Sequence, residues 1–139
     1  MSELPVHVRA GAPSDISFIF ATWLKGYRRS EFARRIPAAL YFNIHHAAIE
    51  RILSRPNVQV HVACSPDDHD SIFGYLVTEP TQVLHHIYVK QVFRRQGVAG
   101  ALVLEAGLDP SRLTFSHFFP DAEWLAAKHP GAVYNPYLL

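Results

Sequence analysis

The spacing of hydrophobic residues changes from a helical to a strand period before the middle of the chain, and this change restricts the fold most. Over residues 13–27 and 37–55, apolar residues recur every three or four positions, which predicts two helices. Apolar and polar residues then alternate over 58–62, which predicts a strand. After a polar turn, 72–78 is its expected hairpin partner, and 82–90, rich in β-branched and aromatic residues, is a third predicted strand. Consecutive strands with short connections favour an antiparallel meander. The chain therefore combines helices with a sheet.

The apolar residues of each predicted helix define its expected buried side. In the first helix they form a predicted buried stripe, which ends near Gly26, a possible stop. In the second helix the repeat is every four residues. The stripe consists of Ile16, Ile19, Phe20, Trp23 and Tyr27, and the four-residue repeat of Leu40, Ile44, Ala48 and Ile52.

Further segments on both sides of this region complete a mixed α/β order. The chain starts with a short alternating strand, Val6–Arg9, and the meander is followed by a predicted helix over residues 97–107. A crossover helix at this place brings the next strand parallel to the strand at 82–90. The remaining predicted elements are that strand at 112–119, a helix at 121–128 and an extended segment from Ala132, so that the order is β α α β β β α β α β.

Length and composition predict a single domain over residues 1–139. Of the 139 residues, 49% are hydrophobic and 18% are charged, which is the balance of a compact globular protein. A chain of this size removes roughly two-thirds of its unfolded surface from water on folding, so it needs no disulfide or metal for a stable core. The net charge of +1 gives no reason to expect nucleic-acid binding. Four arginines between Arg28 and Arg35 could bind an anion or simply be solvated.

Cysteine content and terminal composition favour the cytoplasm. Cys64 is the only cysteine, which excludes an internal disulfide and fits a reducing compartment. The first residues lack a basic region followed by an apolar stretch, and no segment approaches the roughly 18 apolar residues needed to cross a bilayer. We therefore expect a cytoplasmic protein without a membrane partner.

The segment from Ile87 to Leu102 carries the strongest chemical signal. A predicted strand leads there through a basic loop into a helix that begins near Gly97. Glycine lets the backbone approach a ligand closely, and the unpaired N–H groups of a first helical turn attract anions. Arg94 and Arg95 add positive charge, so the segment suits a phosphate or pyrophosphate. A Walker loop and a dinucleotide-binding glycine pattern are both absent from it.

This segment resembles the acyl-coenzyme A loop of the GNAT N-acetyltransferase superfamily. The resemblance rests on Arg94-x-x-Gly97-x-Ala99, which follows the strand residues Ile87–Val89 and precedes Gly100–Leu102. The predicted element order over about residues 6–119 also matches that family. The resemblance implies an α/β fold of the α+β type, with a mixed, mostly antiparallel central sheet and helices on both faces. The region after the last strand is short for the family.

The resemblance also implies acetyl-CoA as cosubstrate and indicates where it binds. Backbone amides from Gln96 to Gly100 are expected to bind the pyrophosphate, and main-chain groups from Ile87 to Val89 the pantetheine arm. The predicted cofactor-binding residues are Ile87, Tyr88, Val89, Arg94, Arg95, Gln96, Gly97, Val98, Ala99 and Gly100.

The catalytic residues are less evident in the sequence. The family often places a glutamate base on the strand before the loop, where this chain has His85 and His86. We predict His86 as the base, ahead of His85, because histidine accepts protons near neutral pH, and Glu79 is the next candidate. The family's usual tyrosine acid is missing at the matching position, so Tyr134 is the candidate acid. Core packing or a solvated turn would also explain these residues.

The expected function is transfer of an acetyl group from acetyl-CoA to a primary amine by direct attack in a ternary complex. A small-molecule amine and a protein amine both fit as acceptor, and a monomer or a homodimer fits equally well. The missing tyrosine leaves a second interpretation, a module that binds acyl-CoA or a protein without turnover. The pairs His45–His46 and His85–His86 are no metal signal, because adjacent strand residues face opposite sides and no H-x-x-x-H spacing occurs.

Overall fold

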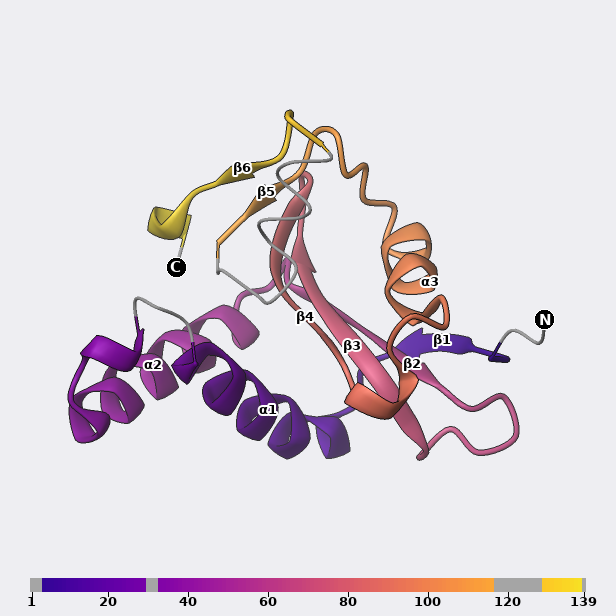
Figure 1. Ribbon diagram of the computed structural model, residues 1–139, viewed down its shortest axis with the longest axis horizontal. Helices are drawn as coiled ribbons and strands as arrows, with labels where there is room; N and C mark the ends of the chain where they lie inside the picture. The colour runs from indigo at the N-terminus through magenta and orange to yellow at the C-terminus, as the bar shows by residue number, and fades with distance from the viewer. Residues whose placement is uncertain (1–3, 30–32, 117–128, 139) are drawn as a thin grey trace.

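Six strands form one sheet in the computed structural model of the protein, which describes residues 4–29, 33–116 and 129–138. The strands lie in sequence order across the sheet (Figure 1). The first four are antiparallel neighbours, whereas the last two are parallel to the strands they pair with. They are β1 (His7–Ala10), β2 (Gln59–Cys64), β3 (Ile72–Glu79), β4 (Val83–Val89), β5 (Thr114–Phe115) and β6 (Val133–Tyr134).

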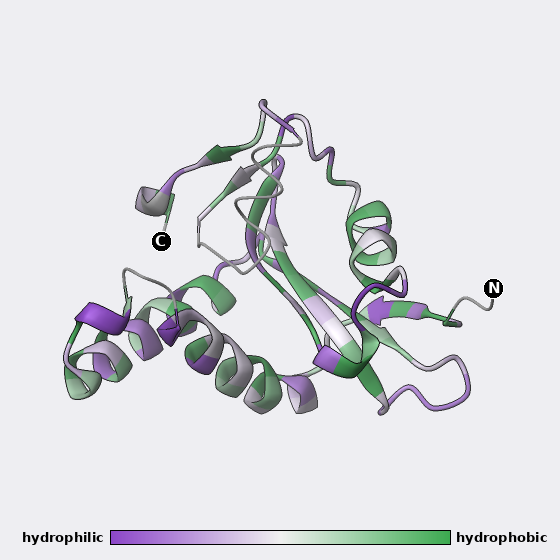
Figure 2. Ribbon diagram, viewed as in Figure 1, coloured by the Kyte–Doolittle hydropathy of each residue, from purple (hydrophilic) through white to green (hydrophobic). Residues whose placement is uncertain are grey.

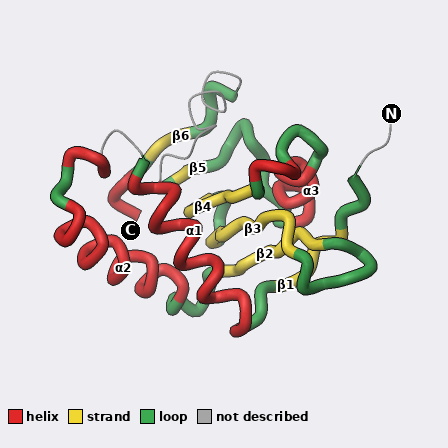
Figure 3. Tube along the Cα trace, turned by 60° about the horizontal axis from the view of Figure 1, so that its bottom comes forward, coloured by secondary structure: helices red, strands yellow, loops and turns green. Residues whose placement is uncertain are grey.

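Helices cover both faces of this sheet. The helices α1 (Ile16–Arg28) and α2 (Ala38–Leu53) lie on one face, and α3 (Val98–Glu105) lies on the other (Figures 1 and 3). Because strand side chains alternate, β3 supplies Tyr75 and Val77 to the core under α1 and α2, and Leu76 to the core under α3. Figure 2 shows the hydrophobic residues along these central strands and on the helices.

This arrangement confirms the predicted mixed α/β architecture. The antiparallel meander is β2, β3 and β4, and the crossover through α3 brings β5 parallel to β4. The first predicted helix starts as a short 3-10 turn, η1 (Pro13–Asp15), before α1 begins. Residues 117–119 of one predicted strand and the whole predicted helix at 121–128 lie outside the described residues.

The predicted buried sides of α1 and α2 need correction. Ile16 is 37% exposed, Leu40 51% and Ile44 55%, although all three belong to the apolar repeats. A four-residue step advances about 40° beyond a full helical turn, so a row of such steps winds away from the core. The buried side of α2 consists instead of Tyr41, His45, Ala48, Ile49 and Ile52. Gly26 is not a stop either, since α1 continues to Arg28.

A β-bulge in β4 marks the place where the sheet opens. Val77 on β3 pairs with His86, whereas the next residue, Thr78, pairs with Leu84, so His85 is the extra residue. On its other side β4 pairs with β5 only at Val83 and Leu84. Within the described chain, β4 therefore runs on to Val89 without a neighbour on that side, and β5 diverges from it (Figure 1).

Candidate active site

The loop between β4 and α3 has a fixed and unusual backbone. It begins with a 3-10 turn, η3 (Gln91–Phe93), and ends at Gly97, which has a φ of 87° and is the N-cap of α3. This left-handed conformation favours glycine. Arg95 has a φ of 63°, so a second residue of the loop is also left-handed. The left-handed residues Arg95 and Gly97, two positions apart, turn the chain sharply into the helix.

The first turn of α3 is open to a ligand. No side chain caps the helix, and Gly97, Ala99 and Gly100 are exposed. A Cβ atom built on Gly97 or on Gly100 would meet no atom within 4 Å, so there is free space at both positions. Buried Val98 and Leu102 fix the helix against the sheet. The predicted pyrophosphate-binding amides therefore belong to a firmly packed helix with an accessible end.

Two predicted cofactor-binding side chains brace the loop. Arg94 donates from Nε to the carbonyl oxygen of Val89 at 3.0 Å, and Gln96 donates from Nε2 to the carbonyl oxygen of Val92 at 3.0 Å. The Val89 carbonyl is therefore already paired, whereas the pantetheine arm was predicted to bind main-chain groups here. Arg95 is exposed at the same loop.

The other predicted residues of the pantetheine site lie on the part of β4 that pairs with β3 but, among the described residues, not with β5. Ile87 and Val89 pack on the core under α3. Tyr88 points to the opposite face, where its ring contacts Phe18 edge-on at 6.0 Å and Tyr75 at 5.6 Å. The strand is thus anchored on both faces while the main chain beyond the bulge runs along the opening.

His86, the predicted base, is a core residue. Its ring is stacked on Trp23 of α1, with centroids 4.9 Å apart and ring planes 3° apart. Neither ring nitrogen has a hydrogen-bond partner among the described residues. Burial lowers the pKa of His86 to about 3, so its ring is neutral at physiological pH. This position separates His86 from the opening of the sheet.

Glu79 and His85 instead form a hydrogen-bonded pair at the bulge. His85 Nε2 lies 2.8 Å from Glu79 Oε1, and His85 Nδ1 lies 2.7 Å from Ser116 Oγ. Arg55, just after α2, donates to Glu79 Oε1 at 3.1 Å. We call these four side chains the bulge network. His85 and Ser116 are fully buried, whereas Glu79 keeps 23% of its side chain exposed.

The charges of the bulge network follow from its contacts. The hydrogen bond from His85, and a further one from Arg55, hold the pKa of Glu79 below its usual range. Burial lowers the pKa of His85, and the neighbouring Glu79 only partly opposes this effect. The resulting state at neutral pH is an ionised Glu79 beside a neutral His85.

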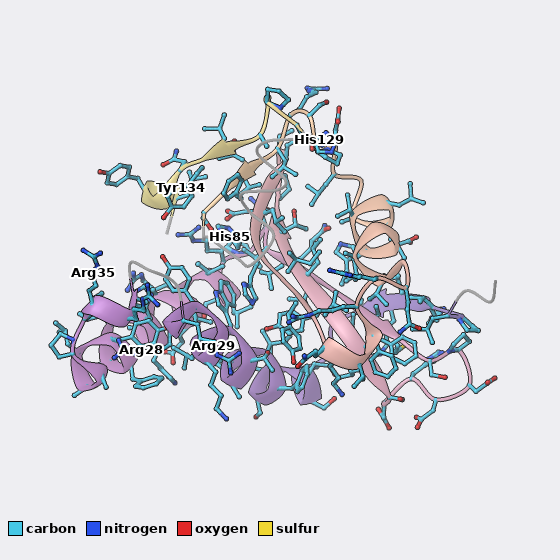
Figure 4. All side chains as sticks on the ribbon, in the orientation of Figure 1. Arg28, Arg29, Arg35, His85, His129 and Tyr134 are labelled. Carbon is cyan, nitrogen blue, oxygen red and sulfur yellow. The ribbon has the colours of Figure 1, made fainter. Side chains whose placement is uncertain are left out.

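Tyr134, the predicted acid, lies on β6, the strand that pairs with β5. It pairs with Phe115 in the sheet, and the two rings are stacked 5.5 Å apart. Tyr27 of α1 is a neighbour of Tyr134. The pKa of Tyr27 is raised above its usual range, mainly by burial and to a smaller extent by the nearby Tyr134. Figure 4 shows Tyr134 and His85 on the side of β4 from which β5 and β6 diverge.

Sequence reasoning missed Ser116 and Arg55 in this site. They are 31 and 24 residues away from the partners that they contact, and only the tertiary fold brings them together. The arginine cluster has a partly structural role, because Arg28 donates to the carbonyls of Ala33 and Ile36, each at 2.6 Å. Arg28, Arg29 and Arg35 are labelled in Figure 4.

The described ranges contain neither a metal-binding group of side chains nor a membrane-spanning helix. There, no three His, Cys, Asp or Glu side chains are grouped so that they could hold a metal ion. Among the helices of the same ranges, none has the length and hydrophobicity to cross a bilayer.

Comparison with known proteins identifies relatives by structure only. No protein-family model matches the sequence, and no curated protein matches it. A protein from Pyrococcus furiosus that is described as an acetyl transferase has a similar structure. Its TM-score is 0.64 at 18% identity, and the match covers 88% of this chain and 91% of that chain. A GCN5-related N-acetyltransferase from Rhodopseudomonas palustris has a TM-score of 0.62 and 17% identity, over 92% and 82% of the two chains.

A third solved structure with the same arrangement is an aminoglycoside 6'-N-acetyltransferase from Acinetobacter baumannii. Its TM-score is 0.55 at 14% identity, and the match covers 90% of this chain and 87% of that one. At such low identity, these likenesses show a shared fold.

Proposed function

We propose that this chain, which has the fold of the GCN5-related N-acetyltransferases, transfers an acetyl group from acetyl-CoA to a primary amine. One observation supports this most: left-handed Gly97 at the uncapped start of α3, at the end of the loop that follows the strand at which the sheet opens. An anionic cofactor and an extended thioester arm both have a place in such an arrangement.

The cofactor is held mainly by main-chain groups in this proposal. The amides from Gln96 to Gly100 bind the pyrophosphate, because the helix dipole and unpaired N–H groups favour an anion there. Exposed Arg95 adds a positive charge beside them. The pantetheine arm runs along the free side of β4 past Ile87 and Tyr88, towards the bulge at His85.

Acetyl transfer then proceeds by direct attack of the amine on the thioester. The attacking nitrogen has to be deprotonated and placed about 3 Å from the carbonyl carbon. Glu79 is the predicted catalytic residue that the bulge network includes, and its carboxylate attracts a cationic amine. Because Cys64 is buried, its thiol is a poor candidate for a nucleophile. This favours a ternary complex over an acyl-cysteine intermediate.

Calorimetric titration of the protein with acetyl-CoA tests this function. We expect micromolar binding, and its loss in Gly97→Glu, which adds a negative charge where the pyrophosphate lies. Gly107→Glu is a matched control: Gly107 also has a positive φ of 72° and open space, but follows the other end of α3. Binding should persist in this control.

Absence of acetyl-CoA binding by the folded wild type would overturn the proposal. If the wild type binds acetyl-CoA but releases no thiol with any primary amine, the protein is a binding module without turnover. Thiol release that depends on an added amine supports the transferase.

A further inference from the structure

Large apolar side chains are exposed on both sides of the open start of α3. Val92 lies in η3, before the turn at Gly97, and is 74% exposed. Leu104 lies in the last turn of α3 and is 82% exposed. Among the exposed large hydrophobic residues of the described chain, only Tyr137 exceeds both. Exposed apolar side chains that gather around one feature mark a contact surface.

The outer side of α3 is suited to close contact. Gly97, Gly100 and Leu104 follow each other at helical spacing, and all three are exposed. A Cβ atom on Gly100 would meet no atom within 4 Å, so a partner can approach the backbone there. The solvent side of a helix is usually polar, but this helix has no charged residue before Glu105. Its outer side therefore fits an apolar partner surface better than water.

The same region is positively charged. Over residues 90–104 the sequence has three basic residues, Lys90, Arg94 and Arg95, and no acidic one. Arg94 and Arg95 are exposed, and Arg95 has no hydrogen-bond or ion-pair partner within the described chain. An acidic partner with apolar side chains of its own complements such a region. We define the α3 surface as Val92, Arg94, Arg95, Gly100 and Leu104.

The position of the α3 surface indicates what this partner carries. In the proposed function, the phosphate of the donor lies at the amides around Gly97, and the pantetheine arm runs along β4. The group attached to the far side of that phosphate therefore lies outside, against the α3 surface. In acetyl-CoA this group is a nucleotide, whereas in a carrier protein the same arm is joined through its phosphate to a serine.

A carrier protein fits the α3 surface better than a nucleotide does. Val92 comes before Gly97 in the chain, whereas Leu104 lies about 10 Å beyond Gly97 along the helix. A nucleotide offers one planar ring for these two side chains, which belong to different elements. A protein interface of standard size covers about 800 Å² on each partner and combines an apolar centre with a polar rim.

We propose that an acidic carrier protein, whose 4′-phosphopantetheine arm bears the acetyl group, docks on the α3 surface and is a donor for this site, an inference that rests on the proposed function. The amine nitrogen bonds to the thioester carbon, and the carbon–sulfur bond breaks. The proton that the amine loses ends on the departing thiolate. The products are the acetylated amine and the carrier protein with a free thiol on its arm.

Two residues of the α3 surface that lie outside the predicted cofactor-binding set distinguish the donors. We would compare acetylated acyl carrier protein with acetyl-CoA, measuring binding by calorimetry and thiol release with ethanolamine and a lysine-containing peptide as probe acceptors. Leu104→Asp removes an apolar side chain and adds a charge that repels an acidic partner. It should raise KM and Kd for the carrier protein at least about tenfold and leave both values for acetyl-CoA unchanged. Val92→Asp should act in the same way.

Leu40→Asp is the matched control for these two variants. Leu40 is an exposed aliphatic residue of α2, which lies on the opposite face of the sheet from α3 (Figure 3). The same change of an apolar side chain to a carboxylate is therefore made far from the α3 surface. This variant should keep the wild-type KM and Kd for both donors.

The possible results separate the two proposals. If the wild type binds neither donor, the proposed function and the carrier donor both fail. If it binds acetyl-CoA and transfers the acetyl group, but does not bind the carrier protein, only the carrier donor fails. Equal weakening of both donors by Leu104→Asp and Val92→Asp would mean that the nucleotide covers the α3 surface, which also overturns this inference. A loss confined to the carrier protein supports it.

Discussion

His86 lies flat against Trp23, with the two ring planes 3° apart and their centroids 4.9 Å apart. The contact joins β4 to α1 within the core under both long helices. Adjacent His85 is held by Glu79 and Ser116 instead. The two consecutive histidines thus have different surroundings, one apolar and one hydrogen-bonded.

Acid should destabilise the fold through His86. Its pKa is lowered to about 3 in the folded protein, against an ordinary value near 6.5, so the unfolded chain binds the proton more readily. The free energy of unfolding is therefore unaffected above pH 6.5 and falls as pH drops from 6.5 toward 3, by about 1.4 kcal/mol per pH unit. Urea unfolding of the wild type and of His86→Phe at pH 7.5 and 5 measures this. The pH dependence should be weaker in His86→Phe, and equal slopes would contradict the assignment.

Asp15 should contribute more to stability than an ordinary surface carboxylate. It is buried, accepts two hydrogen bonds from Arg9 at 2.7 and 3.0 Å, and accepts a third from the N–H of Ala12 at 2.7 Å. Asp15→Asn should lower the free energy of unfolding by about 2 kcal/mol, because it leaves the guanidinium poorly paired. Asp67→Asn, at an exposed loop residue, is the control in the same urea unfolding experiment. Equal effects of the two changes would refute this role.

Gly26→Ala should stabilise the protein. Gly26 is exposed, lies inside α1, and a Cβ atom there would meet nothing within 4 Å. Alanine stabilises a helix interior by about 0.5–1 kcal/mol relative to glycine. Gly107→Ala is the instructive contrast, since the φ of 72° there should make alanine destabilising despite equally open space. Thermal unfolding of both variants checks the opposite signs, and a fall of Tm in Gly26→Ala would contradict the prediction.

Gly74→Ala should disturb the strand that borders the proposed cofactor arm. A Cβ atom on Gly74 would collide with the carbonyl oxygen of Tyr88 and lie 3.1 Å from the Cα of Val89. Both neighbours are backbone atoms, so β3 and β4 would have to move apart. Affinity for acetyl-CoA by calorimetry should fall at least about tenfold, which corresponds to roughly 1.4 kcal/mol. An unchanged affinity would show that the cofactor does not use this part of β4.

The local parts of the fold could be read from the sequence. Alternation over 58–62 predicted β2, the polar turn after it predicted β3 as its hairpin partner, and the β-branched and aromatic residues of 82–90 predicted β4. The glycine between a basic loop and an apolar helix predicted the start of α3. Each of these features depends on residues within a few positions of one another. The parallel pairing of β5 with β4 followed from the length of the connection through α3.

The bulge network of the candidate site could not be read in the same way. Alternation cannot show a bulge, so nothing in the sequence distinguishes His85 at an irregular position from His86 in the core. The contacts of His85 with Ser116 and of Glu79 with Arg55 depend on strand register and on where α2 ends. The exposed positions of Leu40 and Ile44 have a similar origin, since the side of α2 that is buried depends on how the helix lies on the sheet.

The bracing of the loop before α3 implies a rigid receptor for the proposed cofactor. Arg94 and Gln96 tie the loop to Val89 and Val92, and Arg95 and Gly97 already have the left-handed backbone that the turn requires. Little conformational entropy remains to be lost when a ligand binds, so affinity here would depend on the fit of the ligand's phosphates rather than on ordering of the protein. Such preorganisation favours fast association and selection by shape.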